Sequence, residues 1–157
     1  MDYIRRDLIS SGQLRRLIEE DGLQGMISNS AIFEKAIVDS HEYDEDIRAM
    51  ALEVTGVSAI YDTLSQRDVQ SAADEFRSVY AKTDGHDGYV SLEVNPHLAH
   101  DTNGTVAEAH RLWKLLARPN VFIKVPAMTE GLSAIQELIS EDINVNVTLL
   151  FGLPRYR

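Results

Sequence analysis

The feature that most constrains the fold of this chain is an alternation of short apolar segments with amphipathic helical segments. Short apolar segments of the kind that form buried strands cover residues 25–28, 89–93, 121–125 and 143–151. Helical spacing of apolar residues fills 105–117 and 129–140 between the later strands. Parallel strands need a crossover of this kind, so the order predicts an α/β chain with a parallel sheet.

The first half of the chain is expected to be mainly helical. Apolar residues at helical spacing predict helices over 3–21, 31–38, 43–54, 58–64 and 68–82. Gly22 stands where the C-cap of the first helix is expected. A turn at Gln66-Arg67-Asp68 is expected to separate the last two helices, and the glycines and aspartates of 83–88 predict a loop.

Both an open doubly wound sheet and a closed (β/α)₈ barrel fit this alternation. No glycine-rich dinucleotide or phosphate-loop fingerprint follows a strand, so a nucleotide-binding fold has no support. A complete barrel typically needs about 250 residues. The chain has 157, so the pattern predicts either a smaller α/β domain or part of something larger. No linker divides the sequence, and residues 1–157 are expected to form a single domain.

Composition excludes several classes of protein. The net charge of −10 disfavours nucleic acid and anionic membranes as partners. The sequence has no cysteine, which rules out disulfides and thiolate metal sites. No apolar run approaches the ~18 residues of a membrane span, and the start lacks the apolar stretch of a signal peptide. A cytoplasmic protein is therefore the default expectation.

Polar side chains recur where the predicted strands end. The carboxyl ends of parallel strands lie at one face of such folds, and that face holds the functional site. The residues at these positions are Asn29, Glu93, Lys124, Asn146 and Thr148. Buried parallel strands are normally near-continuous apolar runs, so packing alone explains this recurrence poorly.

Lys124 is the sharpest candidate, because it is the one charge in residues 122–126. A lysine buried among apolar side chains loses hydration, which favours the neutral, nucleophilic amine used in Schiff-base chemistry. The alternative is a strand-end lysine that reaches water, and spacing leaves the two evenly balanced.

The other candidates have structural alternatives as well. Glu93 could be a general acid or base, although an ion pair with a lysine is the commoner explanation for such a glutamate. Asn146 and Thr148 share one face of their strand and could hold a water or a substrate hydroxyl. Taken alone, this pair is better explained by a satisfied core hydrogen bond.

The histidines do not indicate a metal centre. His97 and His100 are three residues apart, and His110 and Glu108 follow, but their spacing matches no zinc-binding motif. A solvated surface is the favoured interpretation.

Four blocks of the sequence together resemble the transaldolase family, in its longer bacterial branch that also occurs fused to glucose-6-phosphate isomerase. The blocks are residues 28–37 (SNSAIFEKAI), 87–94 (DGYVSLEV), 123–127 (IKVPA) and 143–151 (INVNVTLLF). They occur in the family's order and span essentially the whole chain. The resemblance implies part of a (β/α)₈ TIM barrel.

The resemblance also implies an activity, the transfer of a dihydroxyacetone unit between sugar phosphates in the pentose phosphate pathway. Substrates of the fructose 6-phosphate and sedoheptulose 7-phosphate class are implied. By resemblance, Lys124 matches the Schiff-base lysine that attacks the ketose carbonyl. No metal or organic cofactor is implied, because that lysine serves as the electron sink.

Each remaining candidate matches a family residue. Asp2 matches the proton-transfer aspartate at the end of the first strand, and Asn29 matches the asparagine that positions the intermediate. Glu93 and Thr148 match the pair that holds the catalytic water. Asn146 matches the asparagine beside that pair.

The sequence departs from the family pattern at three points. Ser30 stands where a proline usually follows the asparagine, which is expected to loosen the turn that aims Asn29. Met128 stands where threonine is usual, and Asp142 replaces a glycine. If that glycine has a positive φ, the aspartate is expected to cost some stability but to be tolerated.

Both ends of the chain differ from the family pattern as well. Almost nothing precedes Asp2, and the later strands with the serine and arginines that bind the substrate phosphate have no counterpart. The chain resembles roughly the first half of a barrel with its opening strand missing. Open strand edges and apolar faces predict self-association if it is made alone.

Two alternatives to transaldolase activity remain. One is a truncated, catalytically inactive fragment, which is favoured for these residues in isolation because a barrel site draws on several strands. The other is a transaldolase-like aldolase that uses free dihydroxyacetone.

Overall fold

Four strands form one sheet in which their order is the same as their order along the chain. The computed structural model describes residues 1–53 and 56–153. The strands there are β1 (Gly25–Ile27), β2 (Tyr89–Glu93), β3 (Val121–Pro126) and β4 (Val145–Thr148), and the sheet order is β1-β2-β3-β4. A doubly wound sheet reverses its order at a switch point, whereas a barrel does not. The prediction of an α/β chain that forms part of a barrel is therefore confirmed.

The chain divides into two units, Met1–Val90 and Ser91–Arg157, with the boundary inside β2. The helices of the first unit are α1 (Arg6–Ser10), α2 (Gln13–Glu20), α3 (Ser30–Val38), α4 (Asp44–Glu53), α5 (Val57–Glu75) and α6 (Arg77–Lys82). Those of the second unit are the 3₁₀ helix η1 (Pro96–Leu98), α7 (Thr102–Leu116) and α8 (Thr129–Ser140).

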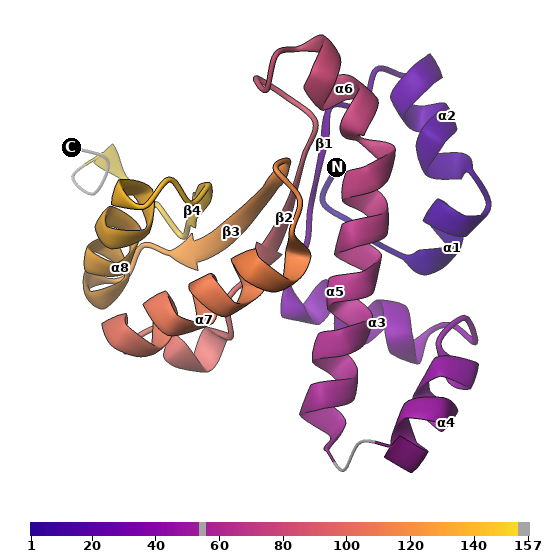
Figure 1. Cartoon of the computed structure of the whole chain (residues 1–157), viewed down its shortest axis with the longest axis horizontal. Coiled ribbons are helices and arrows are strands. Elements are labelled where there is room, and N and C mark those ends of the chain that lie inside the picture. Colours follow the sequence, from indigo (N-terminus) through magenta and orange to yellow (C-terminus); the bar gives the residue numbers. More distant parts are fainter. Residues whose placement is uncertain (54–55, 154–157) are drawn as a thin grey trace. The chain divides into compact units, whose positions relative to one another are not determined.

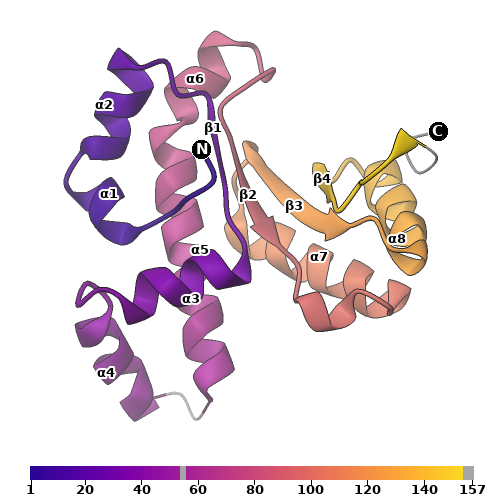
Figure 2. The same cartoon turned by 180° about the vertical axis from the view of Figure 1, so that it is seen from behind.

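The long helix α5 organises the first unit. Helices α1, α2 and α4 all contact it, as Figure 2 shows from behind. Buried apolar side chains of α5 include Leu64, Val69 and Ala72. Leu64 also packs with Tyr43 and Met50 in a separate apolar cluster. Burial of this stripe, rather than intrinsic propensity, is what stabilises helices of this kind.

A buried polar network ties α5 to the start of α1. The hydroxyl of Tyr43 donates to Asp68 Oδ2 at 2.7 Å, and Arg6 Nε donates to Asp68 Oδ1 at 3.0 Å. Arg6 Nη1 donates to Asp46 at 2.7 Å, and the guanidinium lies 4.3 Å from the centre of the Tyr43 ring. Burial raises the pKa of Asp68 despite these partners, and burial together with Asp68 raises the pKa of Tyr43.

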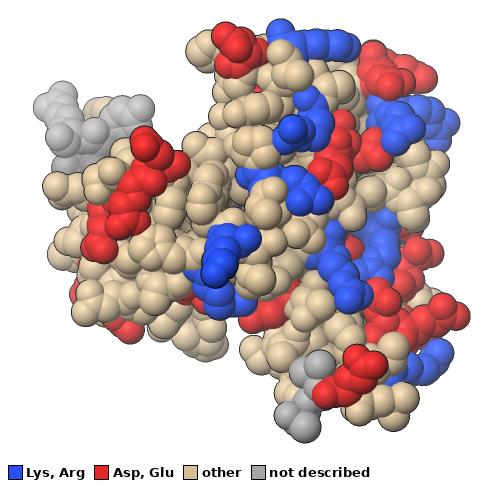
Figure 3. Space-filling model, viewed as in Figure 1, with Lys and Arg blue, Asp and Glu red and all other residues tan. Residues whose placement is uncertain are grey.

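The surface of the first unit mixes charges of opposite sign. Figure 3 shows Lys and Arg side chains interspersed with Asp and Glu over the visible face. Arg15 and Glu75, for example, form a two-bonded pair with both nitrogen–oxygen distances at 2.9 Å. Such pairs neutralise the cations locally.

In the second unit, α7 and α8 pack on each other and on strands β3 and β4 (Figure 1). Val121, Ile123 and Val125 of β3 are fully buried. Asp101 is the N-cap of helix α7, and its carboxylate accepts a hydrogen bond from the Gly104 N–H at 2.9 Å. The helices therefore bury alternate residues of β3, and Lys124 lies on the other face of this strand.

Several predicted boundaries were right. The strand 89–93 and the helix 129–140 match β2 and α8 at both ends, and the loop 83–88 lies between α6 and β2. The acidic residues after His41 open α4 in its first turn. Val54, the predicted last residue of that helix, lies outside the described residues.

Two predicted boundaries in the first unit were wrong. The turn at Gln66-Arg67-Asp68 does not exist, because α5 continues through it and the break comes at Phe76. The single helix predicted over 3–21 is split between α1 and α2 by Gly12, whose φ is +74°. That left-handed conformation suits glycine and interrupts the helix.

Two boundaries in the second unit also differ from the sequence-based ranges. Helix α7 begins at Thr102, three residues before the predicted start, because Asp101 provides the cap. Strand β4 ends at Thr148 instead of Phe151, since Leu149 has a φ of +62° and leaves the extended conformation.

Two of the departures from the family pattern lie at the two ends of α8. Met128 occupies the N-cap, where it makes no side-chain hydrogen bond. Asp142 follows the C-cap with a φ of +60°, and the Ile143 N–H donates to Leu138 O at 3.1 Å. This is the Schellman arrangement, in which glycine is the usual residue. The condition under which the aspartate is expected to cost some stability, a positive φ, is met at Asp142.

Both ends of α8 are therefore expected to gain stability from the family's residues. Met128→Thr supplies a capping oxygen and Asp142→Gly relieves the left-handed strain, each adding roughly 0.5–1 kcal/mol to the free energy of unfolding. Urea denaturation followed by circular dichroism measures both.

Gly22→Asp is the reciprocal control, because Gly22 has a φ of +69° and no atom within 4 Å of an added Cβ. A Gly22→Asp variant as stable as the parent would contradict the strain argument.

Candidate functional site

The candidate site lies on the face of β3 that α7 and α8 do not cover. Side chains alternate along a strand, so Lys124 points away from its fully buried neighbours Ile123 and Val125. In the parallel register of β3 and β4, Lys124 pairs with Asn146 and Pro126 pairs with Thr148. Three residues predicted from strand ends are thus brought onto one sheet face of the second unit.

Glu93 of β2 is the ionic partner of Lys124. Lys124 Nζ lies 4.0 Å from Glu93 Oε2, and the side chains are 12% and 18% exposed respectively. The Val94 N–H donates to the Lys124 carbonyl oxygen at 3.1 Å, which joins the two strands at this level. The alternative of a lysine extended into water does not describe this side chain. The ion pair expected for an isolated glutamate is present, and its partner is the candidate nucleophile.

Burial raises the pKa of the Glu93 carboxyl group above its ordinary value of 4.5, and the positive charge of Lys124 opposes this effect. Desolvation disfavours the charged carboxylate and is the larger of the two effects. A carboxyl group shifted in this direction is better matched to proton transfer near neutral pH than an exposed glutamate is.

Asn146 makes a hydrogen bond of the kind that the sequence favoured for it, with a partner that the sequence did not identify. Its Nδ2 donates to the hydroxyl oxygen of Ser91 on β2 at 3.0 Å. Ser91 is 2% exposed. A sequence signal for Ser91 did exist, because it lies two residues before Glu93 and so shares its strand face. Thr148 is half-buried, and its carbonyl accepts from the Ala127 N–H at 2.8 Å.

Asp2 and Asn29 belong to the first unit, where both flank β1. Asp2 forms a parallel bridge with Ile27, and the Ile27 N–H donates to the Met1 carbonyl at 2.8 Å. Asp2 therefore lies beside β1 through a single bridge. The structure brings together Glu93, Lys124, Asn146 and Thr148 within the second unit, and it describes Asp2 and Asn29 within the first.

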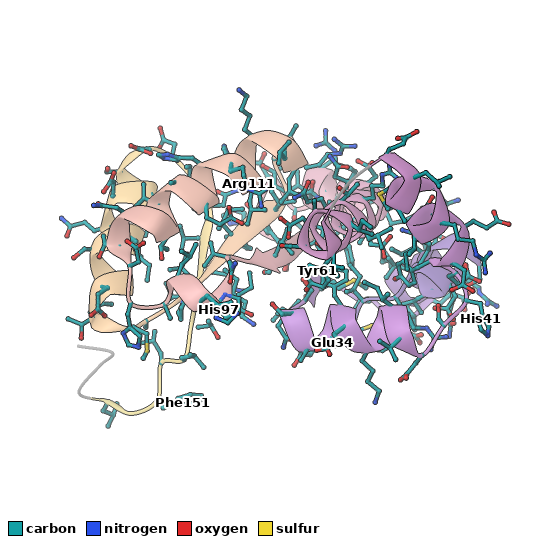
Figure 4. The ribbon with its side chains drawn as sticks, turned by 90° about the horizontal axis from the view of Figure 1, so that it is seen from below. Glu34, His41, Tyr61, His97, Arg111 and Phe151 are labelled. Carbon is teal, nitrogen blue, oxygen red and sulfur yellow. The ribbon has the colours of Figure 1, made fainter. Side chains whose placement is uncertain are left out.

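Asn29 is the N-cap of α3. Its Oδ1 accepts a hydrogen bond from the Ile32 N–H at 2.9 Å. Ser30 is the first residue of that helix, where the resemblance implies a proline and where proline is favoured for its fixed φ. Tyr61 of α5, labelled in Figure 4, donates its hydroxyl to the Ser30 carbonyl at 3.4 Å. The capping bond thus fixes the Asn29 side chain in the absence of that proline.

The histidines lie at the surface of the molecule. His97 is exposed on η1 (Figure 4), and His100 forms a 3.3 Å contact with Glu130. His110 pairs with Glu141. Within residues 1–53 and 56–153, no cluster of three or more His, Asp or Glu side chains has the arrangement of a metal site. Over the same residues, no helix has the length and apolar character needed to cross a bilayer.

Comparison with known proteins identifies the relatives of this chain. A family model described as transaldolase/fructose-6-phosphate aldolase matches residues 1–157. The chain is 47% identical over 157 residues to a transaldolase of Saccharopolyspora erythraea and 46% identical over 156 residues to one of Trichodesmium erythraeum. A transaldolase of Thermobifida fusca is 47% identical over 157 residues.

These alignments cover 99–100% of this chain but 41–43% of each of those three relatives. The chain therefore spans less than half the length of the curated proteins that it matches. Its similarity is nonetheless continuous, since the family model extends from the first residue to the last. The chain belongs to the transaldolase/fructose-6-phosphate aldolase family.

Proposed function

We propose that this chain carries the Schiff-base centre of a transaldolase, which transfers a dihydroxyacetone unit between sugar phosphates. One observation carries the proposal: Lys124 is 12% exposed, lies 4.0 Å from the half-buried carboxyl of Glu93, and shares its sheet face with Asn146 and Thr148. An amine held in this way next to a carboxyl group suits covalent catalysis on a carbonyl.

In the proposed reaction, the neutral amine of Lys124 adds to the C2 carbonyl of a ketose phosphate, and loss of water gives an iminium ion. The C3–C4 bond then breaks. Its electron pair moves into the iminium to form an enamine, while the C4 hydroxyl loses its proton and the aldose phosphate departs. Addition of the enamine to an acceptor aldehyde and hydrolysis of the new iminium return free Lys124. The lysine is the electron sink, so the scheme requires no cofactor.

We assign the remaining roles from the family resemblance. Glu93 and Thr148 hold the water that enters and leaves at C2, and Asn146 lies beside them. Asn29 positions the covalent intermediate, and Asp2 takes the proton from the C4 hydroxyl. The raised pKa of Glu93 supports its role, because this carboxyl exchanges protons with water more readily near neutral pH.

The names of the relatives favour transaldolase over the aldolase alternative. The family description covers both activities, whereas the relatives from Saccharopolyspora erythraea, Trichodesmium erythraeum and Thermobifida fusca are all named transaldolase. On this basis we propose fructose 6-phosphate and sedoheptulose 7-phosphate as donors. We also propose the pentose phosphate pathway in the cytoplasm as the setting.

Borohydride trapping tests the proposal. The chain is incubated with fructose 6-phosphate and sodium borohydride, and the intact protein is weighed by mass spectrometry. We expect one reduced ketose adduct per chain, and a much weaker signal with sorbitol 6-phosphate, which has no carbonyl group. A folded chain that gains no mass would favour the inactive-fragment alternative and contradict the proposal.

The pKa of Glu93 predicts how its replacement alters stability with pH. A raised pKa means that the folded state binds this proton more tightly than the unfolded state, so the contribution of Glu93 to stability falls as pH rises above 4.5. Glu93→Gln is therefore expected to gain stability relative to the parent between about pH 4 and pH 7. Urea unfolding at both pH values measures the difference.

Glu130 provides a control of opposite sign. The backbone N–H of Glu130 and its hydrogen bond with His100 lower the pKa of this exposed carboxyl group. Glu130→Gln is therefore expected to lose stability relative to the parent as pH rises over the same range. Equal trends for the two variants would contradict the assigned pKa shifts.

We also propose that the isolated chain self-associates. Phe151 and Leu153 are 79% and 71% exposed, and Leu132 and Ile139 on α8 are 52% and 56% exposed. Exposed apolar side chains of this size favour association.

A further inference from the structure

Ser91 is a buried polar residue between two buried apolar residues of β2. Its neighbours Val90 and Leu92, at 0% and 6% exposure, lie on the opposite face of β2. Ser91 itself is 2% exposed. A buried hydroxyl costs free energy unless it is hydrogen-bonded, so the choice of serine here calls for a polar role.

One hydrogen-bond partner of Ser91 lies two strands away. Asn146 Nδ2 donates to Ser91 Oγ at 3.0 Å, although β4 is the neighbour of β3 and not of β2. The Asn146 side chain must therefore reach across β3. Asn146 pairs in register with Lys124, so the hydrogen bond crosses β3 on the face that carries Lys124.

In the structure, this hydrogen bond engages the donor end of the Asn146 amide. An asparagine amide has a donor end, NH₂, and an acceptor end, the carbonyl oxygen. With Nδ2 directed at Ser91, Oδ1 remains as the acceptor. A sugar hydroxyl can donate to Oδ1, whereas a rotated amide would present N–H groups in its place.

We propose that Ser91 is a positioning residue that fixes the orientation of the Asn146 amide, so that Oδ1 accepts a hydrogen bond from a hydroxyl of the ketose held at Lys124. The part that concerns the ketose rests on the proposed function. The part that concerns the amide rests on the Ser91–Asn146 contact. Ser91 acts through Asn146 and takes no part in bond making or breaking.

Hydrogen exchange of the Asn146 side-chain amide tests the contact independently of activity. Nuclear magnetic resonance, with the signal assigned by its loss in Asn146→Ala, measures the exchange rate of the NH₂ protons in the parent and in Ser91→Ala. We expect exchange about tenfold faster in Ser91→Ala. Ser133→Ala makes the same substitution at an exposed position of α8 and should leave the rate unchanged. Equal rates in the parent and Ser91→Ala would overturn the inference.

A double-mutant cycle on borohydride trapping tests the consequence for the ketose. Ser91→Ala is expected to slow trapping of fructose 6-phosphate about tenfold in the parent and to have no further effect in Asn146→Ala. An equal slowing in both backgrounds would mean a merely structural role and would overturn the inference. If the parent forms no adduct, the proposed function fails, while the amide exchange rates still decide whether Ser91 orients Asn146.

Discussion

Lys124→Ala is expected to lower the rate of borohydride trapping by about a thousandfold or more, to the level of the unreactive chain. The amine of Lys124 supplies the bond to the ketose in the proposed reaction, and no neighbouring group replaces a deleted nucleophile efficiently. The time course of mass gain with fructose 6-phosphate measures the effect.

Lys114→Ala is the matched control for this prediction. Lys114 lies on α7 in the same unit and is exposed, so its removal should leave the trapping rate within about twofold of the parent. Circular dichroism should show that both variants are folded. Continued trapping in Lys124→Ala would mean that another amine reacts, and would contradict the role given to Lys124.

Asp68→Ala is expected to lower the free energy of unfolding by about 3 kcal/mol. The Asp68 side chain is 4% exposed and accepts hydrogen bonds from Arg6 and Tyr43. Its removal leaves the buried Tyr43 hydroxyl without this acceptor, and it leaves Arg6 with the ion pair to Asp46 of α4. Urea denaturation followed by circular dichroism measures the change.

Tyr43→Phe separates the contribution of one hydrogen bond from that of the charge. It removes the hydroxyl that donates to Asp68 and keeps the ring beneath the Arg6 guanidinium. We expect a loss of about 1 kcal/mol. An Asp68→Ala variant no less stable than Tyr43→Phe would contradict the view that the Arg6–Asp68 pair stabilises the first unit.

The same aspartate explains why one part of the fold could not be predicted from sequence. Gln66-Arg67-Asp68 has the composition of a turn, yet α5 runs through it. Asp68 faces inward because its partners are Arg6 and Tyr43, which lie 62 and 25 residues away in the chain. The residues next to Asp68 in the sequence contain no information about such distant partners. Tertiary contacts therefore outweigh the turn composition and keep this segment helical.

The second unit was easier to predict, because its strands and helices are bounded by local signals. β2 and α8 follow directly from apolar periodicity. The early end of β4 was not predictable in this way, since it depends on the left-handed conformation of Leu149, a residue type that rarely adopts it.

For the site, strand-end position selected Asn29, Glu93, Lys124, Asn146 and Thr148, and the structure places the last four on one sheet face of the second unit. Sequence spacing could not show that Glu93 and Lys124 form an ion pair, because the register between β2 and β3 cannot be read from the sequence. It also missed Ser91, whose importance depends on the reach of the Asn146 side chain across β3. The catalytic roles of these residues, and those of Asp2 and Asn29, remain predictions.

The most direct measurement is the location of the trapped sugar. The chain contains four lysines, Lys35, Lys82, Lys114 and Lys124. Proteolysis of the borohydride-reduced adduct with fructose 6-phosphate, followed by tandem mass spectrometry, identifies the modified side chain. We predict that the reduced sugar group, either the hexitol phosphate or the three-carbon group that remains after C3–C4 cleavage, is found on Lys124. An adduct spread over Lys35, Lys82 and Lys114, or absent from Lys124, would contradict its assignment as the Schiff-base residue.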